Sequence, residues 1–185
     1  MKEDLIKGCR KNSRKAQEAL YREYAPKVIG ICRRYATERD DADDIFQEAF
    51  INIYSSLKKS KEEIQSLEAW IRRISVNTAI NYYHKNKKYA DNLSIDYAKG
   101  QDYNQEYEKI LSKLSMQELL ELISDLPLGC KLVFNLYTIE GYSHKEIAEK
   151  LNISEGTSKS QLSRAKNIMK TKINHSNKVR YESIA

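Results

Sequence analysis

The segment 40–57 reads DDADDIFQEAFINIYSSL and carries the clearest helical pattern in the chain. Apolar side chains recur there every three or four residues, as one face of an α-helix requires. They are Ala42, Ile45, Phe46, Ala49, Phe50, Ile53, Tyr54 and Leu57. Asp40 or Asp41 can cap the start of this helix. The opposite face carries Asp44, Gln47, Glu48 and Ile51. This face is either an ordinary solvated surface or a contact site, because the core has no need of Ile51.

Two flanking segments have the pattern of helices that share a core with this one. Segment 18–35 repeats apolar residues at helical spacing, and Pro26 is expected to kink it or to lie near a helix start. Segment 67–88 follows a polar loop and again shows helical periodicity. Three helices of this kind can form one small bundle, which we place at residues 1–88.

The segment 67–88 presents two different faces. Its inward face is predicted to contain Leu67, Trp70, Ile71, Ile74 and Thr78. Trp70 is therefore expected to be a core residue and not an exposed stacking platform. The other face is a polar and basic stripe, because its members recur at helical spacing. They are Arg73, Asn77, Asn81, His84 and Lys88.

The remainder of the chain predicts a second helical domain. Residues 89–114 show no sustained periodicity and are interpreted as a flexible acidic linker. Residues 115–174 contain further amphipathic segments and form the second domain, and residues 175–185 form a basic C-terminal tail. The predicted fold class is therefore all-α, with two small helical domains joined by a linker.

The second domain contains the pattern of a helix-turn-helix. Ser143 and Glu146 form a capping box that opens one helix, and Gly141 suits the left-handed end of the helix before it. Ser154 caps the next helix after a tight turn. A densely basic second helix fits the major groove of DNA. The side chains expected to reach DNA are Ser158, Lys159, Gln161, Ser163, Arg164 and Lys166. A helical hairpin that merely has a basic surface is the alternative.

The distribution of charge points to a polyanion. The chain has 185 residues, a net charge of +6 and a pI near 9.0. Five basic residues stand against one acid at 67–88, and seven stand against none at 156–180. Between them, residues 89–112 hold five acids and two basic residues. Two basic blocks around an acidic stretch suggest two contacts with one polyanion, although solvated helix faces give the same pattern.

Several classes of protein are excluded by composition. No run of about 18 apolar residues exists, and the start lacks the order of a signal peptide. The three cysteines are far apart and include no CxxC pair, which predicts a reducing cytoplasm and no disulfide framework. The histidines lack metal-binding spacing, and no phosphate loop or nucleophile motif appears. We therefore expect no metal, no cofactor and no catalysis.

Three motifs carry a family resemblance. They are DADDIFQEAF at 41–50, AWIRRISVNTAINY at 69–82, and YSHKEIA at 142–148 followed by SEGTSKSQL at 154–162. Together they resemble the extracytoplasmic-function (ECF) sigma factors, which are small bacterial initiation factors of the sigma-70 type. The resemblance covers about residues 17–173. Ser158 stands where the family commonly has an apolar residue, which resembles a Bacteroidota-like variant.

The resemblance implies two surfaces on the first domain. The face formed by Asp44, Gln47, Glu48 and Ile51 matches the surface that holds the β′ clamp helices of RNA polymerase. The stripe matches the region that melts and reads the −10 element, with Asn77 reading a base extruded from the non-template strand. Its other members by position are Arg73 and Asn81, and the loop 60–66 helps to form the pocket. The implied phosphate contacts are Arg72, Lys85, Lys87 and Lys88.

The resemblance implies a third surface on the second domain, which would read the −35 element. Its residues are Lys159, Ser160, Gln161, Ser163 and Arg164, with Lys166 on the DNA backbone. Gln161 stands where the family commonly has a basic residue, so the base preference at that position is left open. The implied partners are the RNA polymerase core, through its β′ clamp helices and β flap, promoter DNA and an anti-sigma factor.

The function implied by the resemblance is to direct RNA polymerase core to promoters in the cytoplasm and to assist promoter melting. A dimeric helix-turn-helix regulator is one alternative, but it would have no use for the acidic face or for Asn77. An enzyme is the other alternative, and the sequence offers it no catalytic motif.

Overall fold

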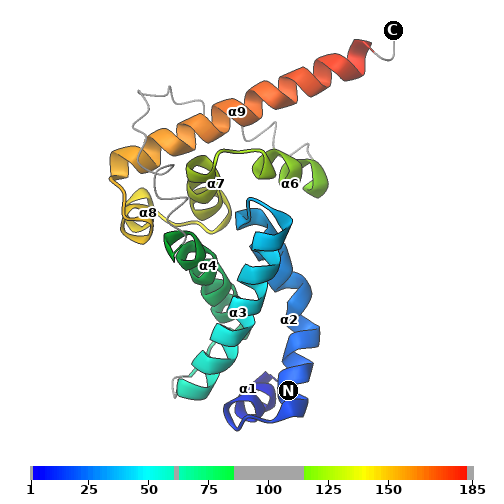
Figure 1. Cartoon of the computed structure of the whole chain (residues 1–185), viewed down its shortest axis with the longest axis vertical. Helices are drawn as coiled ribbons and strands as arrows, with labels where there is room; N and C mark the ends of the chain where they lie inside the picture. The colour runs from blue at the N-terminus through cyan, green and yellow to red at the C-terminus, as the bar shows by residue number, and fades with distance from the viewer. Residues whose placement is uncertain (1, 61–62, 86–114, 183–185) are drawn as a thin grey trace. The chain divides into compact units, whose positions relative to one another are not determined.

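The computed structural model describes residues 2–60, 63–85 and 115–182. The chain divides into two compact units, Met1–Lys85 and Asn86–Ala185, and each is described by itself. Within the described ranges all regular structure is helical (Figure 1), which confirms the all-α prediction. The expected linker at 89–114 lies outside the described residues, and so do the predicted phosphate contacts Lys87 and Lys88.

The first unit is a bundle of four helices. They are α1 (Lys2–Arg10), α2 (Arg14–Tyr35), α3 (Arg39–Lys59) and α4 (Leu67–Lys85). Helix α3 packs against both α2 and α4, and α1 packs against α2 and α3 (Figure 1). The largest fully buried side chains include Tyr24, Tyr35 and Tyr83, and the hydroxyl of Tyr83 donates to the carbonyl of Tyr35 at 2.8 Å. The apolar face that the sequence predicted for segment 40–57 forms part of this core.

The ends of these helices differ from the sequence expectations in three places. Helix α2 continues through Pro26, so this residue marks no helix start. The N-cap of α3 is Glu38, and Asp41 accepts a hydrogen bond from the Glu38 amide at 3.2 Å. Asp41 therefore completes a capping box instead of capping the helix itself. Helix α1 was not predicted, although Ile6 and Cys9 are buried at helical spacing.

The buried face of α4 contains the predicted Thr78 and also Ser75, which was not predicted. Ser75 and Thr78 are buried, and their hydroxyls donate to the carbonyls of Ile71 and Ile74 at 2.9 Å each. Because these hydroxyls are satisfied within the helix, they can be buried without an unpaired donor. The prediction that Trp70 belongs to the core was wrong, since this residue is only half-buried and borders a pocket.

The second unit begins with α6 (Met116–Ser124) and α7 (Leu128–Phe134), which continues into the π-helical turn η2 (Asn135–Ile139). Helices α8 (His144–Leu151) and α9 (Glu155–Glu182) follow. Helix α9 extends beyond residue 174, into the segment that we expected to be a tail. Helix α9 packs against α7 and α8, and its buried side chains include Leu162, Ala165, Met169 and Ile173.

The turn chemistry predicted for this unit is confirmed. The Ser143 hydroxyl accepts from the Glu146 amide at 3.3 Å, and the Glu146 carboxylate accepts from the Ser143 amide at 2.8 Å. Gly141 has a φ of +79°, and the Thr157 amide donates to the Ser154 hydroxyl at 2.9 Å. These contacts fix where α8 and α9 begin. None of the helices in the described part of the chain is long and apolar enough to cross a bilayer.

Candidate nucleic-acid and protein interfaces

The outer face of α3 is exposed and carries an uncovered apolar side chain. Asp44 and Gln47 are exposed, Glu48 is half-buried, and 66% of Ile51 is exposed. Helical spacing places Asp44, Gln47 and Ile51 together on one side of α3, and Glu48 lies at the edge of that side, next to the buried Ile45. We call Asp44, Gln47, Glu48 and Ile51 the α3 face. An exposed isoleucine among acids and an amide is the arrangement of a protein contact site, although single exposed apolar residues also occur on ordinary surfaces.

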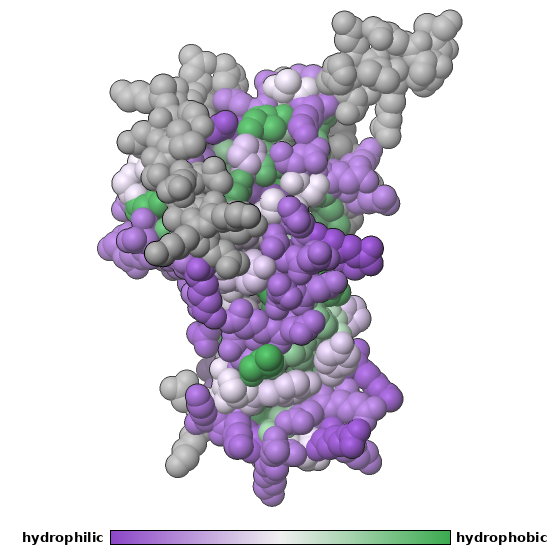
Figure 2. Space-filling view, in the orientation of Figure 1, coloured by the Kyte–Doolittle hydropathy of each residue, from purple (hydrophilic) through white to green (hydrophobic). Residues whose placement is uncertain are grey.

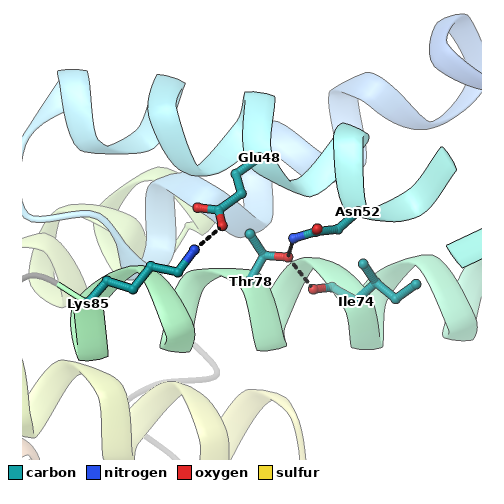
Figure 3. A network of polar contacts seen from close by, with 5 residues as sticks. All are labelled: Glu48, Asn52, Ile74, Thr78 and Lys85. Atoms are coloured by element: carbon teal, nitrogen blue, oxygen red, sulfur yellow. Dashed lines mark hydrogen bonds and ion pairs between the residues drawn. The ribbon is translucent and has the colours of Figure 1, made fainter. Parts of the chain in front are cut away.

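Polar contacts connect the α3 face to helix α4. Lys85 Nζ lies 2.6 Å from Glu48 Oε1, so a predicted phosphate contact pairs with a predicted polymerase contact (Figure 3). One turn further along α3, Asn52 Nδ2 donates to Thr78 Oγ1 at 3.1 Å. The sequence patterns gave no sign that these two candidate surfaces meet.

The polar stripe of α4 is present on the surface. Arg72, Arg73 and Asn81 are exposed, and Asn77 is half-buried. Lys85, at the end of the helix, is exposed but engaged by Glu48. The stripe therefore presents the guanidinium of Arg73 and two amides along one side of the bundle, and Arg72 adds a second guanidinium beside it.

A pocket lies at the N-terminal end of this stripe. Its volume is about 430 Å³, and its wall combines the end of α3, the loop that follows and the first turns of α4. Its lining residues are Ser60, Glu63, Ile64, Gln65, Ser66, Ala69, Trp70 and Arg73. Trp70 and Arg73 thus both line one cavity, whereas Asn77 is not among its described lining residues.

The first turns of α9 present the basic side chains of the second unit. Lys159 is exposed, and the other partly exposed predicted contacts are Ser160, Ser163, Arg164 and Lys166. Helix α8 precedes this helix across the turn that begins at Asn152, whose φ is 54°. The two helices therefore have the order and the short connection of a helix-turn-helix.

Two of the residues predicted to reach DNA from α9 are buried instead. Ser158 is fully buried, and its hydroxyl lies 2.9 Å from His144 Nδ1. Gln161 is 2% exposed, and its Oε1 accepts a hydrogen bond from the thiol of Cys130 at 3.0 Å. Burial raises the pKa of Cys130 to about 11, so the sulfur keeps the proton that it donates. The burial of both side chains argues against the prediction that Ser158 and Gln161 read DNA.

His144 is the first residue of α8 and contacts Ser158 of α9. Its ring stacks on Tyr137, with ring centroids 4.5 Å apart. Burial, followed by the positive charge of Lys159, lowers the pKa of His144 below its ordinary value. The neutral ring is therefore favoured at the position where it meets the Ser158 hydroxyl.

The described residues offer no site for a metal. Among them no group of three or more histidine, cysteine or acidic side chains lies close enough to hold an ion. The three cysteines are buried and free, and burial raises the pKa of Cys32 to about 12. A buried, protonated thiol is a poor nucleophile.

Comparison with known proteins assigns both units to one family. The model of sigma-70 region 2 matches residues 20–89, and the model of sigma-70 region 4 matches residues 116–169. The ECF RNA polymerase sigma-E factor of Haemophilus influenzae is 30% identical over 179 residues, which cover 91% of this chain and 93% of that protein. The chain belongs to the ECF RNA polymerase sigma factor family. The sigma-E factor of Escherichia coli K12 is 26% identical over 178 residues, covering 91% of this chain and 92% of that protein.

A solved structure of a sigma factor with an anti-sigma factor from Bartonella quintana has a TM-score of 0.48 and 19% identity. The matched region covers 83% of this chain and 94% of the chain in that structure. Membership in the ECF sigma factor family confirms the recognition made from the motifs. A sigma factor is an initiation factor that works with RNA polymerase core on promoter DNA and catalyses nothing itself.

Proposed function

We propose that this ECF sigma factor binds core RNA polymerase through the α3 face. The observation that carries the proposal is Ile51, which is 66% exposed between Gln47 and Glu48. Covering an exposed isoleucine contributes about 1–2 kcal/mol, and surrounding acids and amides can pair with basic and polar groups of the β′ clamp helices. In the free protein nothing among the described residues covers this side chain.

For the −10 element, we propose that the pocket beside Trp70 receives a base extruded from the non-template strand. Extrusion costs a few kcal/mol of stacking and pairing, and stacking on an aromatic ring returns about 1–3 kcal/mol per base. The indole of Trp70 offers such a ring, and Arg73 offers a cation for the adjacent phosphate. Arg72, Asn77 and Asn81 continue the contact along α4, and Lys85 and Lys88 extend it as phosphate contacts.

The proposed −35 contact is made by α9, which enters the major groove from the second unit. Its contacts are Lys159, Ser160, Ser163, Arg164 and Lys166. Gln161 drops out of this set because its amide oxygen is engaged by Cys130 inside the unit. Lys159, the most exposed of the set, is the strongest candidate for a guanine or phosphate contact.

We propose that each predicted domain has its own binding role. Residues 1–88 hold the polymerase and the −10 element, residues 115–174 hold the −35 element, and residues 89–114 connect them. We propose that the protein acts in the cytoplasm, where it meets RNA polymerase. Regulation by an anti-sigma factor and contact with the β flap stay predictions from the family, as does the Bacteroidota-like branch.

Two variants test the α3 face and the pocket separately. Ile51→Ala should weaken capture of core polymerase about tenfold, and Arg33→Ala, an exposed position on α2, should leave it unchanged. Trp70→Ala should impair promoter opening on a closed duplex more than binding to a premelted template. Unchanged polymerase capture by Ile51→Ala together with Gln47→Ala refutes the α3 face as the contact. Tight duplex binding by the free protein as a dimer would support a helix-turn-helix regulator instead.

A further inference from the structure

A group of cations at one end of the first unit has no ionic partner among the described residues. The group contains Lys11 at the corner between α1 and α2, Arg14 and Lys15 at the start of α2, and Lys58 and Lys59 at the end of α3. All five are exposed. We call them the cationic corner. Figure 1 places α1 beside the C-terminal end of α3, and this end of the unit is mostly hydrophilic in Figure 2.

Two other cations of α2 are neutralised by acids. Arg22 lies 2.8 Å from Glu18, and Lys27 lies 2.6 Å from Glu68. The cationic corner therefore differs from the ordinary surface of α2, where basic residues pair with carboxylates.

The packing of α2 against α3 brings Arg14 and Lys58 toward each other. The two helices run antiparallel, with the rings of Tyr21 and Phe50 4.8 Å apart and the Tyr54 hydroxyl donating to the Gln17 carbonyl at 2.9 Å. The next positions on the same faces are Arg14, three residues before Gln17, and Lys58, four residues after Tyr54. Like charges on neighbouring helix faces repel, so an anion between them would relieve the repulsion.

The corner is held in place by specific local contacts. Asn12 has a φ of 59°, and its side-chain oxygen accepts from Gln17 Nε2 at 3.0 Å. The Ser13 amide donates to the Gly8 carbonyl at 3.0 Å. Gly8 packs so tightly on α2 that an added Cβ would lie 2.5 Å from Ala16 Cβ. Because the turn is fixed in this way, the backbone that carries Lys11, Arg14 and Lys15 is held in place before any ligand arrives.

The cationic corner adjoins the pocket proposed to receive the extruded base. Lys58 and Lys59 directly precede Ser60, which lines the pocket, and Arg73 lines it from α4. The stripe of α4 begins at Arg73, and Lys85 lies at the other end of the same helix. A strand that follows α4 from Lys85 toward Arg73 therefore reaches the pocket first and the cationic corner next.

We propose that the cationic corner binds the phosphates of single-stranded DNA that continues past the extruded base. This rests on the proposed −10 function of the pocket and extends it to a second contact on the same strand. The contact reads no bases, because lysine and arginine at an open surface bind phosphate without sequence information. It adds phosphate contacts to the melted strand and so stabilises the open promoter relative to the closed duplex.

The test uses the full chain assembled with core polymerase and forked promoter DNA, with a promoter recovered by in vitro transcription of genomic fragments. The non-template strand ends at the extruded base in the short fork and continues several nucleotides further in the long fork. Arg14→Gln with Lys58→Gln removes two phosphate contacts, and each lost contact reduces the slope of log K against log salt concentration by about 0.7. Binding to the long fork at roughly 0.1 M salt should therefore weaken about 25-fold. Binding to the short fork should not change.

The matched control is Arg22→Gln with Lys27→Gln, which removes the same charge from α2 and should affect neither fork. Lys11→Gln with Lys15→Gln is a second pair of substitutions, and the melting curve of each variant establishes that it folds. Equal effects on both forks, no effect on either, or a loss of core polymerase binding would each overturn the proposal, the last in favour of a protein contact. A failure of the pocket assignment is recognised separately, because Trp70→Ala would then leave binding to the short fork unchanged.

Discussion

Replacing the buried Gln161 separates a structural role from a DNA-reading role. Gln161→Ala removes a side chain that is 2% exposed and leaves the Cys130 thiol without its acceptor. Truncation of a buried side chain of this length costs about 2–5 kcal/mol when it is wholly apolar. Because the amide is polar and the thiol is a weak donor, we expect the low end, about 2 kcal/mol. For a unit of this size the melting temperature should fall by roughly 8–16 °C.

The two units can be followed separately in the intact chain. Trp70 is the chain's single tryptophan and lies in the first unit, so its fluorescence reports that unit alone. Far-UV circular dichroism reports the helices of both units. Gln161→Ala should lower the dichroism transition of the second unit and leave the fluorescence transition in place. Gln161→Met, which keeps the volume and loses the acceptor, should cost less than about 1.5 kcal/mol.

A changed base preference at the −35 element without a change in melting temperature would refute this reasoning. That result would mean that Gln161 leaves the interior to read DNA, as the motif first suggested. Lys159→Ala is the control for stability, because this side chain is exposed and its removal should change stability by less than about 0.5 kcal/mol.

Three further outcomes are expected. Lys159→Ala should weaken binding to a −35 duplex and lower the salt slope by about 0.9 if it holds a phosphate, which a salt titration of binding measures. Burial and the charge of Lys159 lower the pKa of His144, so the unfolded chain binds the proton more readily than the folded one. The second unit should therefore lose stability as pH falls through about 6.5. Melting curves at several pH values should show this loss, and His144→Gln should remove it. Gly8→Ala should destabilise the first unit by about 1–3 kcal/mol, because the new Cβ meets Ala16, whereas Gly30→Ala, with open space around it, should stabilise α2 by up to about 1 kcal/mol in tryptophan-fluorescence melts.

The parts of the fold that the sequence predicted well depend only on the spacing of apolar residues and on capping residues. The apolar face of segment 40–57 and the capping box of Ser143 and Glu146 required only local rules. The spacing of the α3 face predicted its exposure, because acids and amides had no place in the core. The capping residues of α8 and α9 were also readable, since a side chain and an amide three residues away suffice to define them.

The parts that could not be predicted depend on polar side chains that find partners inside the fold. Ser75 looks solvent-directed in the sequence but bonds the carbonyl one turn earlier. Ser158 and Gln161 look like DNA contacts but bond His144 and Cys130, which are 14 and 31 residues away. Periodicity counts apolar residues and assigns such polar ones to the surface. This error also moved Trp70 into the core, since the true inward face of α4 includes the polar Ser75.

The pocket itself was expected only from the family resemblance, through the loop 60–66 and Asn77. Its walls come from the end of α3 and the first turns of α4, so its lining depends on how two helices cross and not on local spacing. The contribution of Trp70 to this wall was missed, although an aromatic residue next to Arg73 was a usable signal.

The ion pair between Glu48 and Lys85 couples the proposed binding of polymerase at Glu48 to the proposed binding of DNA at Lys85. A polymerase group that takes the carboxylate must first separate it from the ammonium, which then becomes available to a phosphate. Thermodynamic reciprocity requires that DNA held by Lys85 strengthens the grip on polymerase by the same factor. A surface pair of this kind is worth about 0.2–1 kcal/mol, so the coupling amounts to at most about fivefold and fades as salt rises. In the proposed scheme, Lys85 of the free subunit becomes available to DNA only after polymerase has engaged Glu48.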